Sequence, residues 1–205
     1  MFDHIFIAVL IFTAFVCREN INVVSVVAII TFQLVIDQLA WPLMNLLPYF
    51  KFFLYIIAFG LIYYLQHDKL IYLILPVTIL TALTEIYWQV TEYSGPQITW
   101  YVWLMISQLI VRHLLFIRVA IVDSYFSKQG VSINLDWVIY KLAALTVLVQ
   151  AIMLLEYLAR HLGDLSDLLM MYAAFPYIVQ CIGTITIWVV FHESYKLLLP
   201  KLLKV

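Results

Sequence analysis

Seven long apolar segments, separated by short polar breaks, make up most of the chain. A helix of roughly 20 apolar residues crosses the ~30 Å hydrocarbon core of a membrane. Only 11% of the residues are charged and 66% are hydrophobic. Soluble domains carry about 25% charged residues, so a soluble fold of this composition would leave large apolar areas facing water. The sequence therefore predicts an integral membrane protein, in a bacterial inner membrane or a plasma-type membrane.

The polar breaks give the bounds of the expected helices. We expect helices over residues 4–17, 21–40, 49–65, 70–90, 97–122, 137–158 and 168–191. Trp41-Pro42 and Gly95-Pro96 are typical helix-ending or turn signals. The pattern predicts an all-α, polytopic transmembrane helical bundle of about seven helices, or six if the short first segment does not span. Residues 1–205 would form a single transmembrane domain without a separate soluble domain.

The distribution of basic residues predicts the orientation, because cytoplasmic loops of membrane proteins are enriched in Lys and Arg. With seven spans, Lys51 and Arg160 fall on one side of the membrane. The other side receives the remaining nine of the eleven basic residues: Arg18, Lys69, Arg112, Arg118, Lys128, Lys141, Lys196, Lys201 and Lys204. We therefore expect the N-terminus outside and the C-terminus in the cytosol.

Three acidic residues stand out because a charge inside a bilayer costs several kcal/mol unless it is paired. Asp37, Glu85 and Glu156 each lie about 22–26 Å along an expected helix that runs outward. The three carboxylates are a possible cation or proton site facing an outer vestibule. The alternative is that Asp37 and Glu85 reach headgroup water while Glu156 pairs with Arg160 one turn further on.

A second group is basic and lies toward the expected cytosolic side. Arg112, His113 and Arg118 share the fifth expected helix, and Lys141 lies on the sixth. Such a group is a possible site for an anion or a lipid headgroup, because arginine can offer two parallel donors to a phosphate. The alternative is simple anchoring, in which long basic side chains reach the interface.

Other site chemistries find little support in the sequence. The histidines lack the spacing of a metal site, and no nucleophile stands next to a base in a suitable setting. We expect no metal, no cofactor and no nucleic-acid partner, and a non-enzymatic role is favoured.

Three functions stay open from the sequence. The favoured hypothesis is a membrane-embedded subunit or effector that works through helix–helix and lipid contacts, in a homo-oligomer or with other membrane protein subunits. The second is a small channel or transporter coupled to cations or protons, which the three acids and the prolines Pro76 and Pro176 inside helices favour. The third is a lipid-acting membrane enzyme that uses Arg112 and His113.

Overall fold

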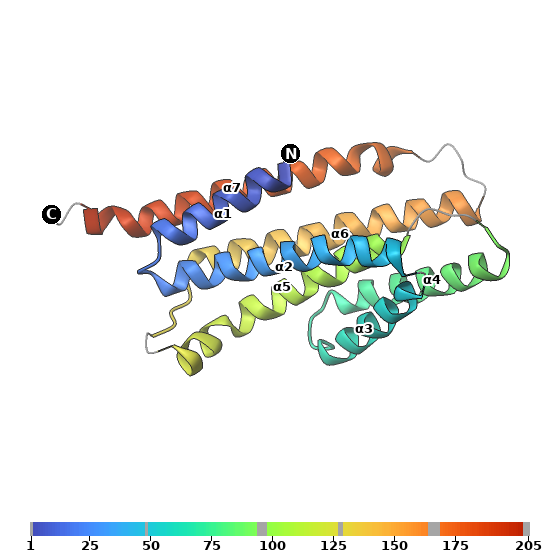
Figure 1. Cartoon of the computed structure of the whole chain (residues 1–205), viewed down its shortest axis with the longest axis horizontal. Helices are drawn as coiled ribbons and strands as arrows, with labels where there is room; N and C mark the ends of the chain where they lie inside the picture. Colours follow the sequence, from blue (N-terminus) through green and yellow to red (C-terminus); the bar gives the residue numbers. More distant parts are fainter. Residues whose placement is uncertain (1, 48, 94–97, 127–128, 164–168, 203–205) are drawn as a thin grey trace. The chain divides into compact units, whose positions relative to one another are not determined.

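The chain folds into seven α-helices, as the computed structural model shows for residues 2–47, 49–93, 98–126, 129–163 and 169–202 (Figure 1). In chain order the helices are α1 (Phe2–Val16), α2 (Ile21–Leu46), α3 (Phe50–Tyr64), α4 (Ile71–Val90), α5 (Ile98–Tyr125), α6 (Asn134–Leu162) and α7 (Met170–Leu202). The expected all-α fold of about seven helices is confirmed. The expected turn at Gly95-Pro96 and the side of Lys128 lie outside the described residues.

Five of these helices are long and apolar enough to cross a membrane: α2, α4, α5, α6 and α7. Helices α1 and α3 are apolar but have only 15 residues each. At 1.5 Å per residue they extend about 22 Å, less than the ~30 Å of a hydrocarbon core. The protein is thus an integral multi-pass membrane protein, whereas complete spanning by α1 and α3 stays a prediction, as does the orientation.

The expected end of the second helix at Trp41-Pro42 is wrong, since α2 continues through Pro42 to Leu46. A proline inside a helix removes one backbone donor. Helix α2 nevertheless carries the buried side chains of Ala40 and Met44 on either side of Pro42, within one apolar cluster. Packing on both sides of the proline therefore holds the helix together.

Helix α6 begins three residues before the expected start at Trp137. The Asp136 carboxylate accepts a hydrogen bond from the Ile133 backbone N–H at 2.9 Å, and the Asp136 N–H donates to the Ile133 carbonyl at 3.0 Å. This reciprocal pair satisfies donors at the helix start, and the acidic side chain suits the positive end of the helix dipole. Asp136 therefore belongs to the first turn of α6 rather than to the preceding loop.

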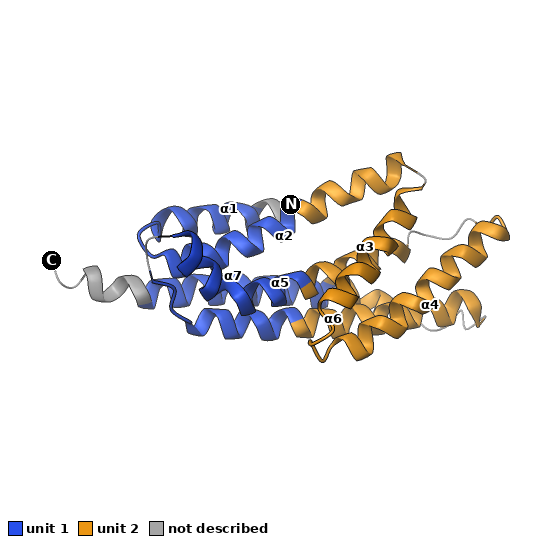
Figure 2. Cartoon of the chain, turned by 90° about the horizontal axis from the view of Figure 1, so that it is seen from below, with its two compact units in different colours: residues 1–35, 110–143, 177–205 blue, residues 36–109, 144–176 orange. Residues whose placement is uncertain are grey.

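Two compact units divide the chain, and each is described by itself (Figure 2). Unit 1 comprises residues 1–35, 110–143 and 177–205, and unit 2 comprises residues 36–109 and 144–176. Unit 1 has an apolar core built from α1, α2, α5, α6 and α7. The larger apolar core of unit 2 is built from α3, α4, α5 and α6. A single transmembrane domain over residues 1–205 stays a prediction.

Candidate functional site

An ion pair between α3 and α4 is the first feature of unit 2 that involves a predicted site residue. The Lys51 ammonium donates to the Glu85 carboxylate, with 2.6 Å between Nζ and Oε1. The Glu85 side chain is 6% exposed and the Lys51 side chain 27%. Because an unpaired carboxylate is so costly in an apolar surrounding, the pairing explains how Glu85 can lie inside the unit.

Buried hydroxyl groups lie around this ion pair. Tyr55 is one turn from Lys51 on α3, and its hydroxyl lies beside Thr81 of α4 and Thr99 of α5. The hydroxyls of Tyr55 and of Tyr157, on α6, lie within electrostatic range of the Glu85 carboxylate. Four helices of unit 2 thus contribute polar side chains to one region, which we call the Glu85 site: Lys51, Tyr55, Thr81, Glu85, Thr99 and Tyr157.

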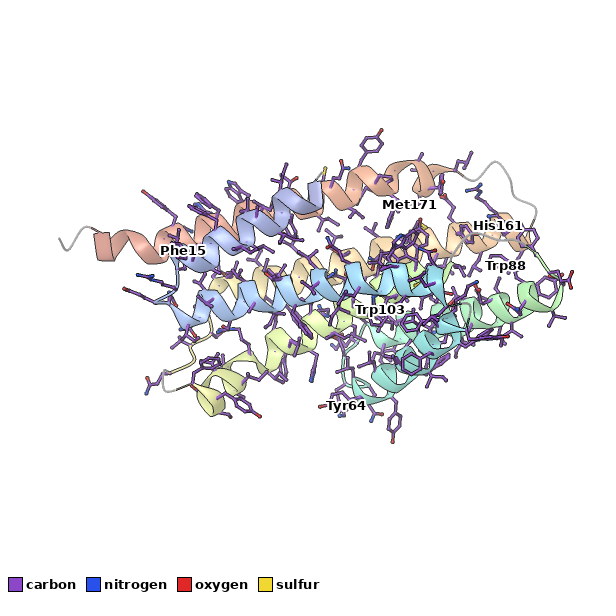
Figure 3. All side chains as sticks on the ribbon, in the orientation of Figure 1. Phe15, Tyr64, Trp88, Trp103, His161 and Met171 are labelled. Carbon is purple, nitrogen blue, oxygen red and sulfur yellow. The ribbon has the colours of Figure 1, made fainter. Side chains whose placement is uncertain are left out.

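An aromatic cluster adjoins this site at the C-terminal ends of α4 and α6. The rings of Trp88 and Tyr157 lie 6.0 Å apart, and those of Tyr157 and His161 lie 4.4 Å apart. Figure 3 labels Trp88 and His161, whose ring centroids are 5.8 Å apart. The Tyr93 hydroxyl and His161 Nδ1 are 3.0 Å apart and share a hydrogen bond. The cluster links the partly exposed His161 to the buried Tyr157.

Asp37 has different surroundings from Glu85. It lies on α2, is 7% exposed, and accepts a long hydrogen bond of 3.4 Å from the Ser107 hydroxyl of α5. A hydroxyl is a weaker partner for a carboxylate than a cation. The described contact of Glu85 is thus with the Lys51 ammonium, and the described hydrogen bond of Asp37 is with the Ser107 hydroxyl.

Glu156 stabilises the start of α7. Its two carboxylate oxygens accept hydrogen bonds from the backbone N–H groups of Met171 and Tyr172, at 2.7 and 2.8 Å. The first four N–H groups of a helix have no partner within the helix, and a negative charge there also suits the helix dipole. Glu156 thus acts as a helix cap supplied by a neighbouring helix, a role that differs from both readings of the sequence.

Arg118 is the best-satisfied polar group of unit 1. Its Nε and Nη2 donate to the two Asp136 oxygens, each at 2.6 Å. Its remaining donors reach the Asn22 and Ser25 side chains, at 3.2 and 3.0 Å, and the Val131 carbonyl, at 2.7 Å. All five guanidinium donors are used, and the residue is 1% exposed. Arg118 is therefore enclosed by protein, and an anion would have to displace one of these partners.

Arg112 contacts Tyr140 of α6. Its guanidinium lies 3.7 Å from the centre of the Tyr140 ring and donates to the Tyr140 carbonyl at 3.0 Å. Tyr140 stacks on Trp137, and the exposed Lys141 ammonium lies 4.8 Å from the centre of the Trp137 ring. Cation–π contacts thus organise Arg112 and Lys141. His113, next along α5, is partly buried. A lipid or anion site at these residues stays a prediction.

Sequence reasoning missed the partners that make these sites. The sequence places Lys51 near the outer end of the expected helix 49–65 with no partner indicated, and it places Asp136 in the loop before the expected helix 137–158. Asn22 and Ser25 are polar residues in an apolar segment, and nothing else in the sequence indicates that they contact Arg118. The spacing from Ile133 to Asp136 could have suggested the cap of α6, but nothing local indicated that Arg118 would meet Asp136.

Among the described residues, no group of three His, Cys, Asp or Glu side chains is arranged to hold a metal ion. The described contacts of the three predicted acids involve different residues, and a shared cation or proton site stays a prediction. No family model matches the chain, and no curated protein or solved structure is significantly similar to it.

Proposed function

We propose that the chain is a membrane-embedded subunit that works as a homodimer, joined through one face of α7. The observation that carries the proposal is the position of Gln180. This residue lies ten residues after Met170, about 15 Å along the apolar part of α7, and it is exposed. An amide in the middle of a bilayer is costly unless another helix provides hydrogen bonds.

The exposed face around Gln180 is continuous along the helix. Five residues of α7 are exposed and follow the spacing of one helix face: Tyr177, Gln180, Cys181, Thr184 and Trp188. We call these five residues the α7 stripe. Only 17% of the most apolar part of α7 is buried, against 33–50% in the other four long helices. Helix α7 therefore offers more uncovered surface than any of them.

A second copy of the chain suits this stripe. Two copies in one membrane share the same orientation, so a two-fold axis along the membrane normal places equal residues opposite each other. Gln180 would meet Gln180, and each amide can both donate and accept a hydrogen bond. No charged residue lies within residues 170–192 to oppose this approach.

The exposed Cys181 provides a direct test, because it belongs to the stripe. Oxidation or a short bifunctional thiol reagent should give a covalent dimer in native membranes, and Cys181→Ser should abolish it. Cys17, the other cysteine, should not contribute. It is 2% exposed, and burial raises the pKa of its thiol, which keeps it in the unreactive protonated form at neutral pH.

Replacing Gln180 should weaken the dimer. Two interhelical hydrogen bonds are together worth roughly 1–2 kcal/mol, so Gln180→Leu should raise the dimer dissociation constant about tenfold. Gln38→Leu is the matched control, since Gln38 is an exposed glutamine on α2 outside the stripe. A monomeric mass in gently extracted membranes, or a fixed mass with a different partner chain, would contradict the proposal.

A further inference from the structure

Two exposed side chains of unit 1, those of Trp137 and Lys141, lie together near the start of α6. Trp137 is 57% exposed, and the Lys141 ammonium lies 4.8 Å from the centre of its ring. Trp137 is one turn closer to the start of α6, so this contact shows that the Lys141 side chain runs back toward that end of the helix. The positive charge of Lys141 is therefore presented on the outer surface, near the end of a long apolar helix.

The position of these residues along α6 corresponds to the surface of a membrane. Helix α6 is long and apolar enough to cross a membrane, and its 29 residues extend about 43 Å. Because this length exceeds the ~30 Å hydrocarbon core, the ends of α6 reach the level of the lipid headgroups. Trp137 and Lys141 lie about 4 and 10 Å along the helix from Asn134, its first residue. Tryptophan favours this level, and a lysine slightly deeper extends its ammonium toward the phosphates.

The charge of Lys141 has no acidic partner in the described part of the chain. Asp136 is the acidic residue in the first turn of α6. Both of its carboxylate oxygens accept hydrogen bonds from Arg118, so its charge is already balanced. An ammonium at the boundary of a bilayer is costly unless water or an anion solvates it. Lys141 is therefore open to an anionic group from its surroundings.

The aromatic rings beside Lys141 are held in place from inside the unit. The Trp137 and Tyr140 rings are stacked, with 6° between their planes. Arg112 of α5 lies 3.7 Å from the centre of the Tyr140 ring and donates to the Tyr140 hydroxyl at 2.7 Å. Buried Arg112 thus positions Tyr140, Tyr140 positions Trp137, and Trp137 positions the ammonium of Lys141. A contact that is arranged in advance loses less freedom when a ligand binds. We call Arg112, Trp137, Tyr140 and Lys141 the α6 basic site.

We propose that the α6 basic site binds the phosphate of an anionic phospholipid, with the Lys141 ammonium as its ionic contact and the Trp137 ring beside it. The proposal is independent of the dimer, since none of these residues belongs to the α7 stripe. A lipid phosphate is favoured over a free phosphate because lipid phosphates are concentrated at the level that Lys141 reaches. An anionic headgroup is favoured over phosphatidylcholine because the choline cation competes with Lys141 for the phosphate.

Native mass spectrometry of the whole chain in a neutral detergent measures this binding. The first phosphatidylglycerol should bind the parent at least about fivefold more tightly than phosphatidylcholine with the same acyl chains. Lys141→Gln should lower the affinity for phosphatidylglycerol about fivefold and leave that for phosphatidylcholine unchanged, whereas Lys141→Arg keeps the charge and should bind like the parent. Lys69→Gln, at an exposed lysine of unit 2, is the matched control and should also bind like the parent.

The aromatic ring is tested in the same way. Trp137→Leu removes the cation–π contact and should weaken phosphatidylglycerol binding about two- to fivefold, whereas Trp137→Phe keeps a ring and should lose less. Trp41→Leu, at an exposed tryptophan of α2, should have no effect. Unchanged binding in Trp137→Leu would contradict the assignment of this ring to the site.

Two further results would overturn the proposal. Equal phosphatidylglycerol affinities of the parent and Lys141→Gln would exclude Lys141 as the ionic contact. Displacement of the lipid by an excess of inorganic phosphate would assign the site to a soluble anion instead of a lipid headgroup. Lipid retained in that excess by the parent, and lost from Lys141→Gln, would support the lipid site.

Discussion

Arg118 and Lys51 are both basic residues in an apolar chain, but their bonding differs. Arg118 uses all five of its donors and is almost completely enclosed. Lys51 is partly exposed, and the one hydrogen bond described for it goes to Glu85. A fully satisfied, enclosed cation resists change, whereas a partly exposed one can leave its partner. The two residues therefore differ in how firmly the surrounding protein holds them.

At the residue scale, loss of Arg118 should destabilise the protein strongly. Arg118→Met leaves the Asp136 carboxylate without its cation, which typically costs about 3–5 kcal/mol. Thermal unfolding in a mild detergent should show a large drop in Tm. Arg18→Met, at an exposed arginine, should change Tm little. The double variant Arg118→Met with Asp136→Asn should recover much of the loss, because the neutral amide oxygen can still accept the Ile133 N–H. Equal Tm values for the single and double variants would refute this account.

At the scale of elements, the start of α7 depends on another helix. The two N–H groups capped by Glu156 belong to the first turn of α7, and no acidic residue of α7 itself lies in that turn. The cap therefore connects α6 to α7, which are separated in the sequence by residues 163–169. The Glu156 side chain thus stabilises the start of α7, and its part in a cation or proton site stays a prediction.

Removing this cap should loosen the beginning of α7 without unfolding the bundle. Glu156→Ala should cost about 1–2 kcal/mol, the usual range for a lost helix cap. Hydrogen exchange at the amides of Met171 and Tyr172 should rise by about tenfold or more, since each 1.4 kcal/mol is a factor of ten. Amides near the middle of α4 serve as the internal reference. Unchanged protection at Met171 and Tyr172 would show that the cap contributes nothing.

At the scale of the whole molecule, the expected orientation of the chain rests on its basic residues. Nine of eleven lie on the expected cytosolic side. The five long helices alone do not decide the number of crossings, because α1 and α3 extend only about 22 Å each. The location of the connections on either side of α4 therefore provides the most informative test of the topology.

Accessibility of engineered cysteines should report that topology. In a Cys17→Ser, Cys181→Ser background, a membrane-impermeant maleimide should label Thr91→Cys in intact cells. Lys69→Cys should be labelled only after the membrane is opened. Both positions are exposed and flank α4 at its two ends. Labelling of Lys69→Cys alone in intact cells would invert the orientation, and labelling of both would contradict a complete crossing by α4.

The sequence by itself determined the all-helical fold, the membrane setting and most helix bounds. These follow from apolar segment length and polar breaks, which are local properties. Local reasoning failed at Pro42, where packing on both sides carries α2 through a proline, and at Asp136, where a cap starts α6 early. It also failed at the end of α7, which continues to Leu202 instead of ending at residue 191. It also placed Asp37, Glu85 and Glu156 among the candidate residues, because charges are rare and expensive in such segments.

Only the tertiary structure decided what those residues contact. Glu85 pairs with Lys51, which lies 34 positions away in the sequence. Arg118 donates a hydrogen bond to Asn22, which lies 96 positions away. Such pairs depend on which helix faces pack together, and continuously apolar helices show little amphipathic pattern from which to read a face. The physical reason is that lipid favours every apolar face almost equally. A few hydrogen bonds and ion pairs between distant parts of the chain therefore determine which helix faces pack together.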